Sequence, residues 1–300
     1  MHALLEICSP DFVLRNSLYA SILLGAVLPL VGIHLVVGNR VMLALALPEA
    51  GHLGVALTAW TAGVLDWKIE SRQRLYFFAC LFGSLILMSL ILAALYLIRS
   101  GSRLGHINTV EGSAQNQNSD QGVIFISCWA GTLALAASNR IPELGLLDVM
   151  RGEILAVSAQ QVWSLAAGFA VIVVLMVVFT GPLKVMLFDS TAAYAMGLPA
   201  GRLHALSMSL VCSAIALGSL CAGPLPVFAF LIIPPVTIQP FVKRFASLCW
   251  GSALVGVLCS FAGFYVSYAF ESWNLPTSAA QIICLGLVWL ASRGALILGK

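Results

Sequence analysis

The sequence predicts an all-α membrane protein, a polytopic bundle of about eight or nine transmembrane helices in one domain over residues 1–300. Of the 300 residues, 60% are hydrophobic and only 9% are charged, and the mean hydropathy is +1.00. An ordinary soluble domain is about 45–50% apolar and about 25% charged. A soluble core could not hide this much apolar surface behind so few charges. A cytosolic enzyme, a disordered chain and a disulfide-stapled secreted domain are therefore excluded.

Charge, cysteine content and motifs narrow the class further. The net charge is only +3 and no dense basic stripe is present, so nucleic acid is not an expected partner. The eight cysteines form no CxxC pair and mostly lie inside apolar runs, where cysteine behaves as a small buried hydrophobe. No GxxxxGKS/T, HExxH or GxSxG motif occurs. We therefore expect no catalytic residue and no bound cofactor in this chain.

The predicted transmembrane helices are apolar runs of about 20 residues, the length that crosses a hydrocarbon core about 30 Å thick. Charged or turn-rich breaks separate them. The sixth and seventh meet at Gly223-Pro224, and the seventh is short, so eight and ten spans stay open as alternatives to nine. The leader MHALLEICSPDF has no basic residue, which argues against a cleaved signal peptide. The predicted spans are 17–37, 41–65, 75–98, 122–139, 160–180, 205–222, 224–241, 246–270 and 276–295.

Lysine and arginine near the span ends predict the orientation, because cytoplasmic loops carry an excess of both. With nine spans and the N-terminus outside, nine basic residues fall inside and six outside, a modest preference for this topology. The inner group is Arg40, Arg99, Arg103, Lys184, Arg202, Lys243, Arg244, Arg293 and Lys300. The outer group is Arg15, Lys68, Arg72, Arg74, Arg140 and Arg151.

Two connecting segments differ in character. Residues 104–121 are polar, contain Gly and Asn and lack periodicity, so they are predicted to form a flexible surface loop on the inner side. Residues 181–204 place apolar side chains among polar ones and are bounded by Gly-Pro and Leu-Pro. This pattern favours a short amphipathic helix at the cytoplasmic face, with an ordinary connecting loop as the alternative.

Few polar side chains lie at membrane depth, where a charge costs at least roughly 2.5–3.5 kcal/mol. Glu49 and His52 in the second span are three residues apart and would share one face of a helix. A carboxylate and an imidazole on one face can hold a hydrated divalent cation or relay a proton. Pro48 would free a backbone carbonyl beside them. A hydrogen-bonded pair that fixes helix packing is the alternative. His34, near the inner end of the first span, is a weaker pathway candidate.

Pro234-Pro235 in the seventh span is expected to interrupt that helix, because both residues lack an N–H donor. Broken helices at membrane depth occur where they line a cavity or are buried in protein. A simple kink near the inner membrane surface is the alternative.

In this order of segments the chain resembles the membrane permease subunits of metal-ion ATP-binding-cassette importers, the ABC-3 family for zinc, manganese and iron. Each motif alone is weak, whereas five in order over nearly the whole chain are a strong signal. They are LLGAVLPLVGIHLVVGNRVMLALALPEAGHLGVAL in the first two spans, RGEILAVSAQQVW at 151–163, LFDSTAAYAMGLPAGRLH at 187–204, GPLPVFAFLIIPPVTIQPF at 223–241 and LPTSAAQIICLGLVWL at 275–290.

One departure from the family pattern concerns the cargo. The family's second helix usually reads D-A-L-S-H-A-x-L-P-G, whose Asp and His are thought to form the metal passage. Aligning the chain on GVAL places Leu45 at the Asp position and Glu49 at the His position. Glu49 can substitute as an oxygen ligand, and His52 lies one turn along the same face. The resemblance therefore leaves zinc, manganese and iron open as cargo, and also a cargo other than a bare cation.

The resemblance implies a mechanism and a set of partners. Two permease copies would form the pathway in the inner (cytoplasmic) membrane, and an extracytoplasmic metal-binding protein would deliver a divalent metal as substrate. Cytoplasmic ATPase subunits would dock near 187–204 and supply ATP hydrolysis, so the chain itself would not be an enzyme. Glu49 and His52 would line the pathway, and the residues that would couple to the ATPase are Phe188, Asp189, Ala193 and Gly197.

The main competing hypothesis is a proton- or ion-coupled secondary transporter. It would have many spans and an intramembrane Glu–His pair but no ATPase partner. A membrane enzyme is disfavoured, because the chain has five histidines and scarcely any intramembrane acid. A permease of the siderophore or cobalamin type shares the general architecture, but its usual landmarks are not found in this sequence.

Overall fold

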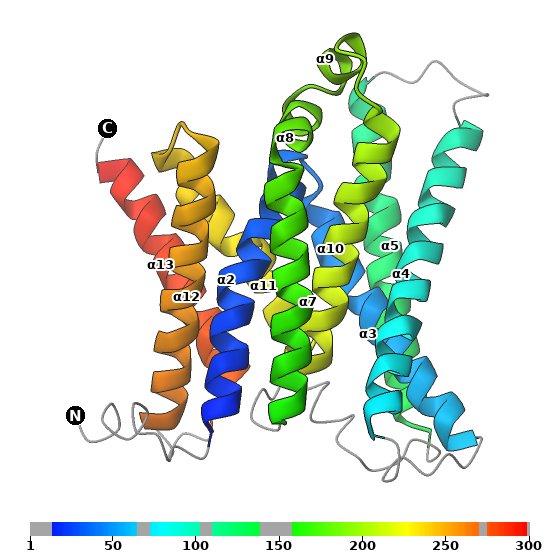
Figure 1. The fold of residues 1–300 in the computed structure, drawn as a ribbon, viewed down its shortest axis with the longest axis vertical. Helices are drawn as coiled ribbons and strands as arrows, with labels where there is room; N and C mark the ends of the chain where they lie inside the picture. Colours follow the sequence, from blue (N-terminus) through cyan, green and yellow to red (C-terminus); the bar gives the residue numbers. More distant parts are fainter. Residues whose placement is uncertain (1–13, 65–72, 103–109, 139–157, 270–274, 299–300) are drawn as a thin grey trace.

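The computed structural model describes residues 14–64, 73–102, 110–138, 158–269 and 275–298, and all regular structure in these ranges is helical (Figure 1). The fold class is the one predicted. The long helices are α2 (Arg15–Val37), α3 (Val41–Val64), α4 (Gln73–Ser102), α5 (Val110–Ala136), α7 (Ala159–Val178), α10 (Ala200–Ala222), α11 (Pro224–Ile238), α12 (Phe245–Ala269) and α13 (Thr277–Leu298). The short elements are α8 (Thr180–Phe188), α9 (Ser190–Ala195) and the 3-10 helix η3 (Gln239–Phe241).

Successive long helices run in opposite directions along the bundle (Figure 1). In the described residues eight helices are long and apolar enough to span a membrane, α5 not among them, which makes the chain a multi-pass membrane protein. α5 is 27 residues long, but its first turns are polar. α2 begins at one end of the bundle, and α13 finishes at the opposite end, where α9 also lies (Figure 1).

Local sequence explains where the helices begin and end. Ser158 caps α7: its Oγ accepts a hydrogen bond from the amide of Gln161 at 3.3 Å, and its own amide donates to Oε1 of Gln161 at 2.8 Å. α2 stops at a tight turn in which Asn39 has a φ of 55°, a left-handed conformation that asparagine tolerates better than most residues. The cap at Ser158 fixes where α7 begins, and the turn at Asn39 fixes where α2 ends.

Residues 104–121 do not form a loop throughout, which corrects the sequence prediction. α5 already begins at Val110, whereas 103–109 lie outside the described residues. The polar side chains of Asn118, Ser119 and Asp120 are exposed on this helix. A helix satisfies its own backbone whatever its side chains are, so a polar run can extend a membrane helix beyond the apolar zone.

The prolines at 234 and 235 do not interrupt α11, which is a second correction. The helix continues to Ile238 and only then tightens into η3. Pro235 leaves the carbonyl of Leu231 without its intrahelical donor. The backbone of Gly32 in α2 packs so closely on this carbonyl that a Cβ there would collide with it. Tertiary contact thus surrounds the interrupted part of the hydrogen-bond ladder and keeps the helix straight enough to continue.

The same arrangement occurs about two turns earlier in α2, counted from Gly32 to Gly25. Pro29 removes the donor for the carbonyl of Gly25, and Gly256 of α12 approaches that carbonyl without space for a Cβ. Close backbone approach at small residues is the usual means of packing helices where no hydrophobic driving force acts between them. α2 is therefore held on two sides by its neighbours α11 and α12.

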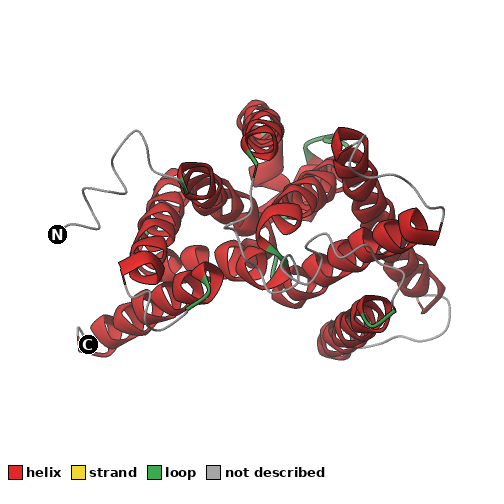
Figure 2. Ribbon diagram, turned by 90° about the horizontal axis from the view of Figure 1, so that it is seen from below, coloured by secondary structure: helices red, strands yellow, loops and turns green. Residues whose placement is uncertain are grey.

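The helices divide into an interior set and a peripheral set (Figure 2). In the apolar stretch of each helix, 67% of the residues are buried in α2 and α3 and 72% in α10, against 17% in α4, α7 and α13. The exposed residues of the peripheral helices are large and apolar, for example Phe82, Val177 and Leu287. This is the surface that a lipid bilayer would cover.

Candidate functional site

Glu49 and His52 lie on α3, an interior helix, and both are buried. Glu49 is 4% exposed and His52 is 2% exposed. The helix runs without a break through Pro48, so the two side chains are three residues apart on a regular helix, as the sequence predicted. Pro48 leaves the carbonyl of Ala44 without its intrahelical donor one turn away. A carboxyl, an imidazole and a backbone carbonyl thus lie within two turns.

Three neighbouring helices surround this pair. Met88 of α4 fills the space over Gly51 so completely that a Cβ at Gly51 would collide with its terminal methyl. Ser219 of α10 lies 3.7 Å from the same point. Cys128 of α5 lies near enough to Glu49 to interact with it electrostatically. The pair is consequently enclosed between α3, α4, α5 and α10, not open to the membrane surface.

One nitrogen of the His52 imidazole makes no hydrogen bond to the described residues. Its Nε2 is buried and has no hydrogen-bond partner within the described ranges. A buried nitrogen without a hydrogen-bond partner is costly, which makes this atom a candidate to bind a water or an ion. In the described parts of the chain, however, no three His, Cys, Asp or Glu side chains gather closely enough to hold a metal ion. The pair supplies part of a coordination sphere and not a complete one.

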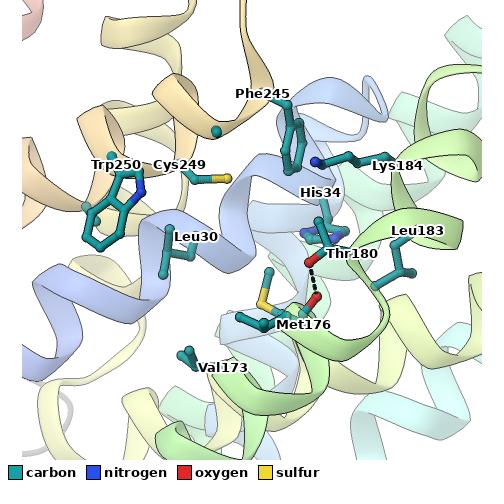
Figure 3. Close-up of a pocket in the computed structure, with 13 residues that line it drawn as sticks. Leu30, His34, Val173, Met176, Thr180, Leu183, Lys184, Phe245, Cys249 and Trp250 are labelled. Atoms are coloured by element: carbon teal, nitrogen blue, oxygen red, sulfur yellow. Dashed lines mark hydrogen bonds between the residues drawn. The ribbon is translucent and has the colours of Figure 1, made fainter.

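His34 does not join this pair. It lies near the end of α2, where it lines a cavity of about 370 Å³ between α2, α7, α8 and α12 (Figure 3). The cavity is also lined by Thr180, Lys184 and Cys249. The sequence had offered His34 as a pathway residue beside Glu49 and His52, and the structure places it in a separate environment with a basic neighbour.

The predicted coupling segment consists of short helices and turns. Only 190–195 forms the short helix expected within 187–204, because α8 reaches Phe188 before it and α10 starts at Ala200 after it. Asp189 caps α9: its Oδ1 accepts hydrogen bonds from the amides of Ala192 and Thr191 at 3.0 and 2.8 Å. The hydrogen bond from the amide of Ala192, with those of Thr191, holds the pKa of Asp189 below its usual value.

The four predicted coupling residues divide into buried and exposed positions. Ala193 is fully buried beneath the turn that follows α9, and its carbonyl accepts the amide of Leu198 at 3.0 Å. Gly197 has a φ of 71°, a left-handed conformation that favours glycine, and faces open space. Phe188 is exposed, with its ring edge-on to Phe245 at 6.2 Å between centroids.

Basic residues collect at the α9 end of the bundle. Arg40, in the turn between α2 and α3, lies with one guanidinium nitrogen 3.0 Å from Nε2 of His204 in α10. Lys184, Arg202, Lys243 and Arg244 belong to the same end by their places in the chain. Sequence reasoning missed the contacts of Cys128, Met88 and Lys184, because each is made between helices far apart in the sequence.

A family profile described as the ABC 3 transport family matches residues 11–293, nearly the full length of the chain. The chain belongs to the ABC 3 transport family. The helices of its described residues are therefore those of a family of transport proteins, and the resemblance inferred from the sequence motifs is confirmed.

Relatives of this ABC 3 family chain include transport proteins with manganese in their names. The manganese import system permease protein ScaB of Streptococcus gordonii is 25% identical over 280 residues, which is 93% of this chain and 90% of the relative. The manganese transport system membrane protein MntC of Halalkalibacterium halodurans is 25% identical over 197 residues, which is 64% of this chain and 66% of the relative. The second match therefore spans just under two thirds of that protein's length.

Two solved structures share the fold. PsaBC from Streptococcus pneumoniae, determined in complex with a Fab, superposes with a TM-score of 0.75 at 22% identity over 94% of this chain and 91% of that one. A metal-chelate type ABC transporter in an inward-facing conformation gives a TM-score of 0.69 at 15% identity, covering 97% of this chain and 89% of that one. The bundle is thus an ABC permease fold.

Proposed function

We propose that the chain is the permease subunit of an ATP-binding-cassette importer that carries a divalent metal ion across the cytoplasmic membrane. The observation that carries this proposal is the buried Glu49–His52 pair on α3 within the ABC 3 family fold. Ionisable side chains inside a membrane bundle are rare, and they mark ion pathways more often than packing contacts. The carboxylate and the imidazole offer oxygen and nitrogen donors that suit manganese, iron and zinc.

The metal is the substrate and passes through the site without residing there. An incomplete set of protein ligands agrees with this role, because conduction needs binding weak enough to release the ion. The unpartnered Nε2 of His52 is the atom best placed to take a metal, and the carboxylate of Glu49 would offset its charge. The manganese relatives make manganese the first metal to test, with zinc and iron beside it.

The proposed importer needs three kinds of partner, and the surface around α9 is proposed to bind the first of them. The exposed residues Phe188, Tyr194 and Met196 around α9 offer an apolar surface to a cytoplasmic ATPase subunit, which would bind and hydrolyse ATP. Docking there would switch the pathway between outward- and inward-facing states, an alternating-access cycle. A second permease copy and an extracytoplasmic metal-binding protein would complete the importer.

A transport assay in reconstituted membranes distinguishes the proposed ATP-driven importer from a secondary transporter. The full chain is placed in proteoliposomes with its ATPase subunit and its binding protein, and uptake of Mn²⁺, Zn²⁺ and Fe²⁺ is measured. Uptake that requires ATP hydrolysis, and is unaffected by collapsing the proton gradient, supports the importer. Uptake driven by a proton gradient in the absence of the ATPase would overturn it in favour of the secondary transporter.

A further inference from the structure

The cavity around His34 lies apart from the Glu49–His52 pair and has a different chemistry. Its volume is about 370 Å³, within the range of small-molecule sites. The side chains around it are mostly apolar, among them Leu30, Val173, Met176 and Ala253. The hydroxyl of Thr180, at the start of α8, donates to the carbonyl of Met176 in α7, which keeps the wall apolar (Figure 3).

A lysine lies at one end of this apolar cavity. Lys184 of α8 reaches across toward α12, and its Nζ lies 4.9 Å from the ring centroid of Phe245 (Figure 3). Lys243 and Arg244 directly precede Phe245 and are exposed. Lys184 thus places a positive charge in the cavity wall, and two further basic residues precede the lining residue Phe245 in the chain.

The cavity opens on the peripheral side of the bundle. Trp250 of α12 lines it and is 80% exposed, and Val177 of α7 is exposed beside it. Trp250 follows Lys243 and Arg244 in the chain, and tryptophan together with basic residues is typical of helix ends at the membrane–water interface. A ligand can therefore enter from the lipid phase, with its polar end level with the basic residues.

We propose that this cavity binds an anionic phospholipid of the cytoplasmic leaflet, with an acyl chain between α2, α7 and α12 and the phosphate on Lys184. The apolar wall fits a hydrocarbon chain, and the basic side chain of Lys184 complements a negative headgroup. Only the assignment of the leaflet rests on the proposed function, through its orientation. The binding itself depends on no transport activity, so a failure of either proposal is visible without the other.

Native mass spectrometry of the purified, delipidated full chain tests the site. Phosphatidylglycerol, phosphatidylcholine and glycerol 3-phosphate are added separately, and the bound fraction is followed by titration. Phosphatidylglycerol should bind with one saturable stoichiometric site, phosphatidylcholine at least about fivefold more weakly, and the free phosphate ester not detectably. Equal binding of the two lipids would overturn the anionic headgroup, and binding of glycerol 3-phosphate alone would overturn the acyl-chain pocket.

Two variants address the two halves of the site, and a third is a matched control. Lys184→Gln should weaken phosphatidylglycerol binding about fivefold, since one basic residue is lost near the phosphate. Ala253→Phe should abolish the saturable adduct by filling the apolar cavity without changing charge. Arg293→Gln removes a basic residue that also lies over an aromatic ring, Trp289 at 5.8 Å, but outside the cavity, and should bind as the wild type does.

The same variants distinguish a lipid site from nonspecific attraction of lipid to basic residues and from a contact between two copies of the chain. Equal losses in Lys184→Gln and Arg293→Gln would show unspecific attraction of lipid to basic residues and would overturn the site. If Ala253→Phe changes the oligomer mass and leaves lipid binding intact, the cavity is a contact between two copies of the chain, and the lipid proposal is wrong. Circular dichroism of each variant in the same detergent verifies that the helices are retained.

Discussion

The α3 polar pair and the α9 segment are built in opposite ways. Glu49 and His52 are buried, and helices distant in sequence enclose them through Met88, Cys128 and Ser219. The α9 segment is exposed and holds its shape through contacts within a few residues, such as the hydrogen bonds between Asp189 and the amides of α9. The difference suits a pathway that must exclude water and lipid, and a docking surface that must meet another protein.

The largest expected effect falls on the buried pair. Glu49→Gln keeps the shape of the side chain but removes the charge that would offset the metal, so ATP-driven metal uptake in proteoliposomes should fall at least about tenfold. Thr61→Val, a polar change at an exposed position of the same helix, should transport normally. Undiminished uptake by both Glu49→Gln and His52→Ala would remove the pair from the pathway.

The next effect concerns the exposed segment. Asp189→Arg removes the cap of α9 and places a positive charge at the positive end of the helix, so the ATPase subunit should no longer co-purify with the chain. Asp189→Asn retains an oxygen that accepts the same amides and should restore most of the yield. Normal co-purification with Asp189→Arg would count against the coupling role of this segment.

Replacing glycine by alanine should affect stability in α3 through steric collision, and after α9 through backbone conformation. At Gly54 a Cβ would lie 2.7 Å from the carbonyl oxygen of Gly83, a backbone atom that cannot easily move. Gly54→Ala should destabilise the bundle by about 1–3 kcal/mol, measured by thermal unfolding in detergent. Gly286→Ala is the control, because a Cβ there meets nothing within 4 Å. Equal melting temperatures for the two variants would show that α3 and α4 can separate freely.

The smallest effect is expected at Gly197. Space is open there, but the φ of 71° is unfavourable for a side chain, and alanine should cost about 1–2 kcal/mol locally. Because the turn lies outside the bundle, the melting temperature of Gly197→Ala should stay close to that of the wild type. ATPase affinity, followed by titration of the ATPase subunit, should instead weaken. A lowered melting temperature of Gly197→Ala with full ATPase affinity would contradict a role of this turn in ATPase binding.

The sequence sufficed for the features that hydropathy or local capping controls. Apolar length predicted the fold class and eight of the nine proposed spans, the exception being 122–139 in α5. The family was predicted from five motifs in order along the chain. The helical state of 110–121 could not be predicted, because a polar run without periodicity is typical of a loop although a helix can satisfy its backbone equally well. The continuity of α11 through Pro234 and Pro235 could not either, because it depends on a helix partner, Gly32, that no local pattern indicates. For the same reason the cavity that links His34 to Lys184 was not foreseen, whereas the position of Glu49 and His52 on one helix was.

Cellular metal content tests the central claim most directly. Manganese, zinc and iron are measured together in cells that lack the chain, in cells supplied with the wild-type chain and in cells supplied with Glu49→Gln at equal membrane abundance. The account predicts that one divalent metal is depleted without the chain, restored by the wild type and not restored by Glu49→Gln. Unchanged content of all three metals in every strain, or full restoration by Glu49→Gln, would contradict it.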